Sequence, residues 1–551
     1  MTDTIGTLGE EFWASYLRDN PTEAHLLGHY PERGRFEDVS RAAEDRVIAT
    51  QRDLAQRAEA LDDSGLDDDE RITRSVLVSN ATTTADLLDA RLAELSADPI
   101  FGIQTSLPLI AGMLGLPDAA VAETLPATFE GIGQHFRDLA QRHLEGVEHG
   151  RTPAAFAVRG TVEQLDAALA VPAERDPVLD ALHPPEGLDV AAWRASLVEA
   201  ISKHVRPGME AYRDALSDEV LAHARTDEQC GLSWLDDGAS AYAATLRYFT
   251  TTDRTAQDIH DVGLAQVASL ADEYRSLGAD ALGTGDLGEI FEKLRTDPAL
   301  HFRTGDELVE ASKVAMARAH DAMGDWFEVV PKAPCAVEGT MTGAKAFYFP
   351  PAEDGSRGGT FFVNIADPTS WGTFELEAMA FHEGIPGHHL QLAIAAELPD
   401  SMPTFRKHMH NSAYAEGWGL YSERLSDEMG LYGSQVDRIG MLAADSMRAT
   451  RLVVDTGIHG LGWGRQQAVD YMLANTPLSE GVVRPEIDRY VVSPGQATSY
   501  MIGRLEIQRM RREAEQRLGD AFSVKHFHSA VLDNGSLPLG VLDQVVKSRL
   551  G

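Results

Sequence analysis

The sequence predicts a mainly α-helical protein that carries one small antiparallel β-sheet. Three observations lead to this fold class: helical periodicity through most of residues 1–325, short β-type runs between 326 and 365, and helical periodicity again from about 372 to the end. The chain of 551 residues is long enough to bury a large core. We expect an N-terminal helical region over 1–325 and a site-bearing region over 326–551, within one continuous fold.

The N-terminal region consists of amphipathic segments such as "EFWASYLRDN" and "DIHDVGLAQVASLADEYRSL", in which apolar residues recur at helical spacing. Joints rich in Pro, Gly and Asp separate these segments, and the clearest joint covers residues 171–190. No repeat of fixed period is present in the sequence, which argues against a solenoid. We expect this region to form one side of a cleft.

The middle of the chain changes character. The runs "WFEVV", "CAVEGTM", "AFYFP" and "GTFFVN" are rich in β-branched and aromatic residues, and turn chemistry such as "EDGSRGG" separates them. These runs predict the small antiparallel sheet. Helices follow it to the end of the chain, with breaks near "ANTPLSEG" and "VVSPGQ".

The net charge limits the partners of this protein. Lys and Arg number 48 against 86 Asp and Glu, which gives a formal charge of -38. Such a charge repels nucleic acids and anionic membrane surfaces, so we expect neither as a partner. The oligomeric state stays open.

Cysteine content and the amino-terminal sequence indicate the cellular compartment of the protein. Cys230 and Cys335 cannot form a disulfide framework, which favours a reducing compartment. The amino-terminal segment is acidic and amphipathic, without the pattern of a secretory signal, and no stretch approaches eighteen uninterrupted apolar residues. The sequence therefore predicts a cytoplasmic protein.

The segment "FHEGIPGHHL" concentrates metal-binding chemistry at residues 381–390. His382 and Glu383 begin it as in the H-E-x-x-H pattern of zinc peptidases, but Pro386 stands where that pattern has its second histidine. In a regular helix His388 would lie about 240° around the axis from His382, and His389 about 10 Å further along it. Neither could share a metal with His382 across an undistorted helix.

Pro386 and Gly387 supply a distortion. Pro386 lacks the N–H that would bond to the carbonyl of His382, and Gly387 tolerates unusual backbone angles. We expect the helix to bulge here, which would return His388 to the position of the second ligand. The alternative is a kinked helix whose histidines are ordinary polar residues.

Glu416, in "NSAYAEGWGLYSERL", is the candidate third ligand. Its helical neighbours at three and four residues include no cation, and Gly417 and Gly419 allow another helix to approach closely. A metal held by two neutral imidazoles would compensate a glutamate packed in this way. Catalytic zinc takes three protein ligands and keeps one open position. A partly exposed glutamate without a ligand role is the alternative.

Four motifs, "HEGIPGHHLQ", "YAEGWGLYSE", "RLVVDTGIH" and "PGQATSYMIG", resemble the bacterial family called "domain of unknown function 885", a branch of the gluzincin metallopeptidases. The resemblance covers nearly the whole chain and is most specific over residues 345–545. Around the metal motif the sequence is also similar to thimet oligopeptidase and carboxypeptidase Taq.

The resemblance implies a large helical gluzincin-like body with a deep cleft and one zinc ion per chain at its bottom. By the same likeness, His382, His388 and Glu416 are the zinc ligands and Glu383 is the general base. His389 is the alternative second ligand, with His388 beside the centre. Two histidines and a glutamate also suit manganese or cobalt.

Tyr500, in "SPGQATSYMIGR", is the candidate donor to the oxyanion of amide hydrolysis. It follows a Pro-Gly turn and the start of a helix, and it stands where the resembling family keeps a tyrosine. The alternative is a core tyrosine whose hydroxyl is satisfied by the protein.

Further polar residues are candidates for substrate contacts or for support of the ligands. One helical face in "DSMRATRLVVDTGIHG" carries a row of four, at three- or four-residue spacing: Arg448, Arg451, Asp455 and His459. In this row His459 is a candidate substrate ligand and Asp455 its orienting partner, while a solvated salt-bridge face is the alternative. Arg489 or Arg504 is the candidate partner of a peptide carboxylate.

The strand "GTFFVN" is a candidate for pairing with the substrate backbone, as an edge strand does in gluzincins. Gly358 and Gly359 at its start would admit a ligand backbone, and Asn364 at its end would offer a polar contact. A plain sheet strand between two turns is the alternative.

The leading functional hypothesis is a zinc-dependent peptidase that acts on short peptides, in the manner of a carboxypeptidase or dipeptidase. Two alternatives stay open: a metal-dependent amidohydrolase acting on a non-peptide or modified-peptide metabolite, and a non-catalytic helical protein that binds a metal or another ligand. Glu383 argues against the last, because a structural zinc site has no use for a base.

Overall fold

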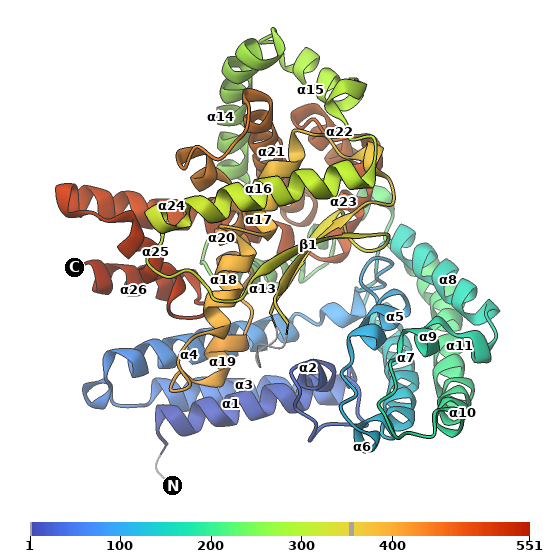
Figure 1. Cartoon of the computed structure of the whole chain (residues 1–551). Helices are drawn as coiled ribbons and strands as arrows, with labels where there is room; N and C mark the ends of the chain where they lie inside the picture. The colour runs from blue at the N-terminus through green and yellow to red at the C-terminus, as the bar shows by residue number, and fades with distance from the viewer. Residues whose placement is uncertain (1–2, 352–356) are drawn as a thin grey trace.

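The computed structural model describes residues 3–351 and 357–551. It confirms a mainly α-helical protein with a small three-stranded sheet (Figure 1). The helices of the N-terminal half are α1 (Ile5–Asp19), α2 (Pro21–Leu26), α3 (Arg41–Glu59), α4 (Asp68–Asp89), α5 (Ile103–Met113), α6 (Ala119–Ala122), α7 (Leu125–Glu148), α8 (Ala155–Ala170), α9 (Pro177–Ala181), α10 (Val190–Ala200), α11 (Arg206–Ala215), α12 (Leu221–His223), α13 (Gly238–Thr250), α14 (Ala256–Leu282), α15 (Leu287–Thr296) and α16 (Gly305–Trp326).

The sheet and the remaining helices follow in the C-terminal half. The strands are β1 (Cys335–Thr340), β2 (Ala346–Phe349) and β3 (Gly359–Asn364). The helices are α17 (Glu375–Glu383), α18 (His388–Ala396), α19 (Thr404–His408), α20 (Ser412–Glu428), α21 (Gln435–Leu461), α22 (Arg465–Asn475), α23 (Glu480–Val492), α24 (Ser499–Leu518), α25 (Val524–Leu532) and α26 (Leu539–Leu550).

The sheet is mixed, so the prediction of an antiparallel sheet is wrong for one of its two strand pairs. β3 lies between the other strands, pairing in parallel with β1 and antiparallel with β2. Sequence patterns locate strands but do not give their spatial order, and here the last strand in sequence inserts between the first two. Phe361 and Val363 of β3 are fully buried, as expected of a central strand.

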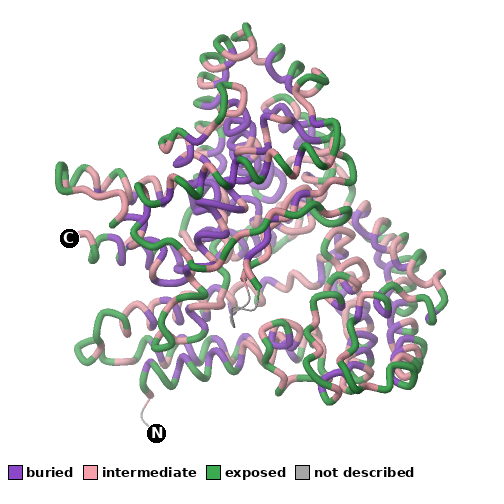
Figure 2. The backbone as a smooth tube through the Cα atoms, in the orientation of Figure 1, coloured by how far each residue is buried: buried purple, intermediate pink, exposed green. Residues whose placement is uncertain are grey.

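The largest hydrophobic core joins both halves of the chain. It contains Phe12 of α1, Leu77 of α4 and Tyr274 of α14 together with Trp418 of α20 and Met501 of α24. A separate core lies among α5 to α11, the group at the lower right of Figure 1. Figure 2 shows the buried backbone concentrated where α17, α20 and α21 pack together. The principal core thus includes residues on both sides of position 325.

Helices α20 and α24 pack unusually closely because each presents a glycine to the other. A Cβ on Gly417 would lie 2.5 Å from the carbonyl carbon of Gly503, and a Cβ on Gly503 would lie 1.9 Å from the carbonyl oxygen of Ala413. The neighbouring atoms are backbone, which cannot move aside as a flexible side chain can. The close approach that the sequence predicts at Gly417 is therefore made to α24.

Replacing Gly503 with alanine is expected to destabilise the protein by about 1–3 kcal/mol, because the added methyl forces the two helix backbones apart. Thermal unfolding followed by circular dichroism measures this as a lower Tm. Gly540→Ala is the matched control, since a Cβ there meets nothing within 4 Å. An equal Tm for the two variants would contradict the described packing of α20 on α24.

Candidate metal centre

The motif segment consists of two helices separated by a short break. α17 ends at Glu383 and α18 begins at His388, so the predicted bulge is a full interruption of the helix. A Cβ on Gly387 would lie 1.9 Å from the carbonyl oxygen of His382, so this position requires glycine. Trp418 Nε1 of α20 donates to the carbonyl oxygen of Pro386 at 3.0 Å, which ties the break to the neighbouring helix.

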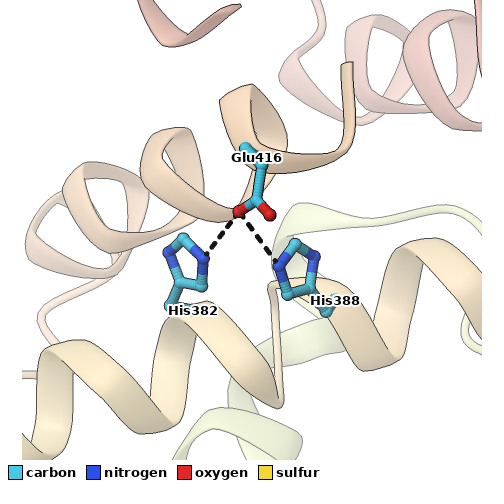
Figure 3. A group of neighbouring side chains, drawn as sticks. All are labelled: His382, His388 and Glu416. Atoms are coloured by element: carbon cyan, nitrogen blue, oxygen red, sulfur yellow. Dashed lines mark ion pairs between the residues drawn. The ribbon is translucent and has the colours of Figure 1, made fainter. Parts of the chain in front are cut away.

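The break brings the three candidate ligand side chains together. Figure 3 shows the rings of His382 and His388 on either side of the Glu416 carboxylate. Glu416 Oε2 lies 3.4 Å from His382 Nε2 and 3.5 Å from His388 Nε2. One ligand atom from each residue lies within 4.8 Å of the others. The group therefore combines residues from α17, α18 and α20.

The charges of the group are strongly coupled. Burial of His382 lowers the pKa of its ring, but hydrogen bonds to Glu416 and Glu423 outweigh burial and raise this pKa to about 9. Burial raises the pKa of Glu416, but its hydrogen bonds to His382 and His388 bring it well below the usual value. The two directions agree, and together they describe a carboxylate stabilised by two imidazoles.

The donor set fits a zinc ion. Tetrahedral zinc with bonds of about 2.0–2.2 Å separates neighbouring ligand atoms by roughly 3.4 Å, close to both nitrogen–oxygen distances of the site. Two imidazoles and one carboxylate also make up the His₂Glu set of catalytic zinc sites. No other group of three or more His, Cys, Asp and Glu residues in the described parts of the chain meets the same geometric condition.

Glu423 contacts His382, the first candidate ligand, and was not predicted. Its Oε1 accepts a hydrogen bond from His382 Nδ1 at 2.8 Å, which leaves Nε2 free to bind a metal. Glu423 follows Glu416 by seven residues, two helical turns, so both side chains point from the same face of α20. Gly419 lies between them, and a Cβ there would be 2.7 Å from the His382 ring. The i, i+7 spacing is the sequence signal that could have identified Glu423.

The three candidate ligands line a cavity of about 500 Å³. Glu383 and Tyr500 line the same cavity, and so do Phe347 and Tyr348 of β2. Tyr500 lies beneath the guanidinium groups of Arg448 and Arg451, which are 5.9 and 4.6 Å from its ring centre. The predicted ligands, base and oxyanion donor therefore face one space.

His410 lines this cavity and was also missed by the sequence reasoning. It lines a second cavity as well, of about 720 Å³, whose walls include residues of α1, α3 and α4. Burial lowers the pKa of its ring. No local pattern marks His410, because its place depends on how the segment before α20 meets the N-terminal helices.

His389, the alternative second ligand, is not part of the group. Its Nε2 donates to the carbonyl oxygen of Ala333 at 3.1 Å, and its Nδ1 accepts from the Tyr348 hydroxyl at 2.9 Å. Burial lowers the pKa of His389 to about 4, so the ring is neutral. A Cβ on Gly359 would collide with this Tyr348 hydroxyl and this ring, at 2.2 and 2.8 Å. Gly359 therefore makes room for protein side chains and not for a ligand.

Asn364 acts within the sheet. Its Nδ2 donates to the carbonyl oxygen of Gly343 at 3.0 Å, and its Oδ1 accepts from the amide of Ala366 at 3.0 Å. β3 is the central strand, so the predicted pairing of this strand with a substrate is wrong. In the described part of the sheet, the edge strand that lines the cavity is β2.

The structure does not bring Asp455 and His459 to the cavity. Asp455 Oδ1 accepts from the Tyr242 hydroxyl at 2.5 Å, and burial raises the pKa of this aspartate to about 7. His459 Nε2 donates to the carbonyl oxygen of Tyr490 at 2.9 Å, and its Nδ1 accepts from the amide of Leu232 at 3.2 Å. The expected i, i+4 links are not made, because α13 and the turn Leu232–Trp234 cover this end of α21.

Arg489 and Arg504 also lie outside the lining of the cavity. Arg504 is buried, and its guanidinium donates to Asp445 at 2.5 Å and to Gln266 at 3.2 Å. Arg489 donates to Gln496 at 2.6 Å and approaches the Tyr500 hydroxyl at 3.5 Å. The arginines that do line the cavity are Arg448 and Arg451.

Fold and site together define a mainly α-helical protein with a His-His-Glu group placed at a helix break. Residues 21–546 match the family described as "bacterial protein of unknown function (DUF885)", and the chain belongs to this family. No curated protein matches the sequence.

The fold is similar to that of solved structures, among them the following two. One is described as a "putative lipoprotein" from Colwellia psychrerythraea, with 23% identity, a TM-score of 0.90 and coverage of 99% of this chain and 98% of that one. The other is described as a "putative lipoprotein of unknown function" from Shewanella oneidensis, with 18% identity, a TM-score of 0.79 and coverage of 98% and 99%.

These neighbours correct the predicted cytoplasmic location. Each is described as a "putative lipoprotein", and lipoproteins are anchored to a membrane outside the cytoplasm, so these descriptions contradict the cytoplasmic prediction. The signals used for it, few cysteines and an acidic amino terminus, are features of composition and do not by themselves fix the location of a protein. Within residues 3–351 and 357–551, no helix combines the length and apolar character needed to span a membrane.

Proposed function

We propose that the protein is a zinc-dependent hydrolase that cleaves amide bonds in short peptides. The observation that carries this proposal is the meeting of His382, His388 and Glu416 in a cavity that Glu383 also lines. A general base beside three ligands is the arrangement of a catalytic site, since a structural site has a fourth protein ligand and no base. The likeness of the motif to gluzincin metallopeptidases supports the same chemistry.

Each side chain has a definite task in this reaction. Zinc, when bound, supplies a Lewis acid that polarises the substrate carbonyl and lowers the pKa of water. Glu383 takes a proton from the attacking water on its carboxylate and delivers it to the leaving amine. Tyr500, whose ring the two arginines hold in place, donates its hydroxyl proton in a hydrogen bond to the developing oxyanion.

The shape of the site favours short substrates. A cavity of about 500 Å³ is of the size that encloses a small ligand and not a folded chain. β2 is an edge strand of the described sheet at the cavity wall, a position from which a strand can pair with an extended peptide. These features support action on peptides of a few residues. The lipoprotein descriptions of the two fold neighbours favour action outside the cytoplasm.

The test is hydrolysis of N-acetylated di- and tripeptides by the zinc-loaded protein, followed by mass spectrometry of the products. We expect cleavage that stops when a chelator removes the metal and returns when zinc is added. Absence of cleavage across peptides of varied side chain, in a folded and zinc-loaded sample, would contradict the proposal.

A further inference from the structure

Arg448 and Arg451 give the wall of the cavity an incompletely satisfied positive charge. Both project from α21, and they are only 6% and 4% exposed. Arg451 donates from Nε to the Tyr490 hydroxyl at 2.7 Å and from Nη2 to Glu486 at 2.9 Å. Its Nη1 is buried and has no hydrogen-bond partner among the described residues. Arg451 is thus held rigidly with one donor unused.

Arg448 is less satisfied than Arg451. Its Nη1 makes a long hydrogen bond of 3.4 Å to the carbonyl oxygen of Ala444, and its Nε is buried without a partner in the described parts of the chain. Its Nη2 lies 3.9 Å from Glu423 Oε1, beyond hydrogen-bond distance. Glu423 already accepts a hydrogen bond from His382, so its carboxylate neutralises the positive charge of Arg448 only in part.

The local charge leaves room for an anion. Three guanidinium groups meet around Tyr500, those of Arg448, Arg451 and Arg489. Two carboxylates face these guanidinium groups, those of Glu486 and Glu423. The Glu423 carboxylate also accepts a hydrogen bond from His382. Buried guanidinium groups with unused donors are costly unless an anion completes their hydrogen bonds. A carboxylate fits best, because its two oxygens can accept two parallel hydrogen bonds from one planar guanidinium group.

The position of Arg448 relative to His382 bears on which substrate carboxylate it could bind. One side chain, Glu423, bridges Arg448 to His382, with separations of 3.9 and 2.8 Å. One extended residue spans about 3.3–3.6 Å. Arg448 therefore lies near His382 in the cavity that the three candidate ligands also line, and this proximity favours a carboxylate on the residue next to the cleaved bond.

We propose that Arg448, backed by Arg451, binds the carboxylate of the substrate residue that follows the cleaved bond, so that the enzyme releases single residues from the carboxyl end of short peptides. This inference rests on the proposed peptidase function. It adds the end of the peptide from which residues are released and the group of the substrate that is recognised. The same fork can receive a main-chain carboxylate or the side chain of an acidic residue, and the test distinguishes these two sources.

The experiment is calorimetric titration of the zinc-loaded Glu383→Gln protein, which binds peptides without turning them over. The probes are acetyl-trialanine with a free carboxylate, its carboxamide, and the carboxamide of acetyl-Ala-Ala-Glu. We expect the free acid to bind on the order of 10- to 100-fold more tightly than either carboxamide. Adding Arg448→Met should reduce binding of the free acid to the level of its carboxamide, while Arg448→Lys should give an intermediate affinity.

Arg484→Met is the matched control, because Arg484 pairs with Glu480 on the outer face of α23 and should leave every affinity unchanged. Equal binding of the free acid and its carboxamide by the protein with Arg448 intact would overturn the inference, whatever the folding of the variants. Preferred binding of the glutamate carboxamide would overturn the main-chain assignment. A preference for the free acid without any hydrolysis by the wild-type protein would instead reject the peptidase function and leave the carboxylate site standing.

Discussion

Replacing Glu383 with glutamine is expected to lower peptide hydrolysis by about 10²- to 10⁴-fold, because the amide cannot accept the proton of the attacking water. Glu383 lines the cavity at the end of α17, directly after His382. It is not one of the three grouped ligands, so the variant should bind zinc as the wild type does. The measurement is the initial rate with a cleaved peptide, with bound zinc determined on the same samples.

Glu397→Gln is the control for the charge change, since Glu397 is exposed at the end of α18 and lies outside the cavity lining. We expect its rate to match the wild type. Full activity of Glu383→Gln with normal zinc content would exclude Glu383 as the base. Loss of zinc along with activity would instead mean that Glu383 acts on the metal directly.

Removing Glu423 is expected to weaken zinc binding by about 10- to 100-fold, because a carboxylate behind a ligating histidine orients its ring and raises its basicity. Glu423 is 1% exposed and accepts from His382 Nδ1 at 2.8 Å. In Glu423→Ala the ring loses this acceptor and also gains space to rotate. In Glu423→Gln the acceptor oxygen stays while the charge is lost, so an intermediate affinity is expected.

Competition with a fluorescent zinc chelator measures these affinities. Glu428→Ala, at the exposed end of the same helix, is the control and should bind zinc normally. Unchanged zinc affinity in Glu423→Ala would show that the contact with His382 does not support the metal. Circular dichroism must show folded protein for each variant, because Glu423 is buried.

Much of the local structure follows from the sequence. Helical periodicity predicts the helices, and three of the four β-type runs are strands, whereas "WFEVV" lies at the end of α16 without forming one. Pro386 with Gly387 predicts a bulge in the motif helix, where the structure has a full break. The pairing of Glu416 with the two histidines was reached from its lack of a cationic neighbour and from the family resemblance. Apart from the family resemblance, each of these signals is local, because it depends on the residues within one or two helical turns.

Contacts between distant segments explain what the sequence reasoning missed. Asp455 and His459 share a face of α21 with Arg451, but α13 covers them while Arg451 reaches the cavity. Glu423 gains its role only because Gly419 lets the His382 ring approach α20. The glycine at 359 suggested a ligand path, yet the space above it belongs to Tyr348 and His389. In each of these examples, the packing of distant segments determines which residues a side chain contacts.

The central claim is that His382, His388 and Glu416 hold one zinc ion, and metal stoichiometry tests it most directly. The protein is purified without added metal or a histidine tag, and its metals are measured by mass spectrometry beside His388→Ala and Glu416→Ala. We expect close to one zinc per chain in the wild type and a large loss in both variants. A folded wild-type protein that holds no metal, even after zinc is offered, would contradict the account.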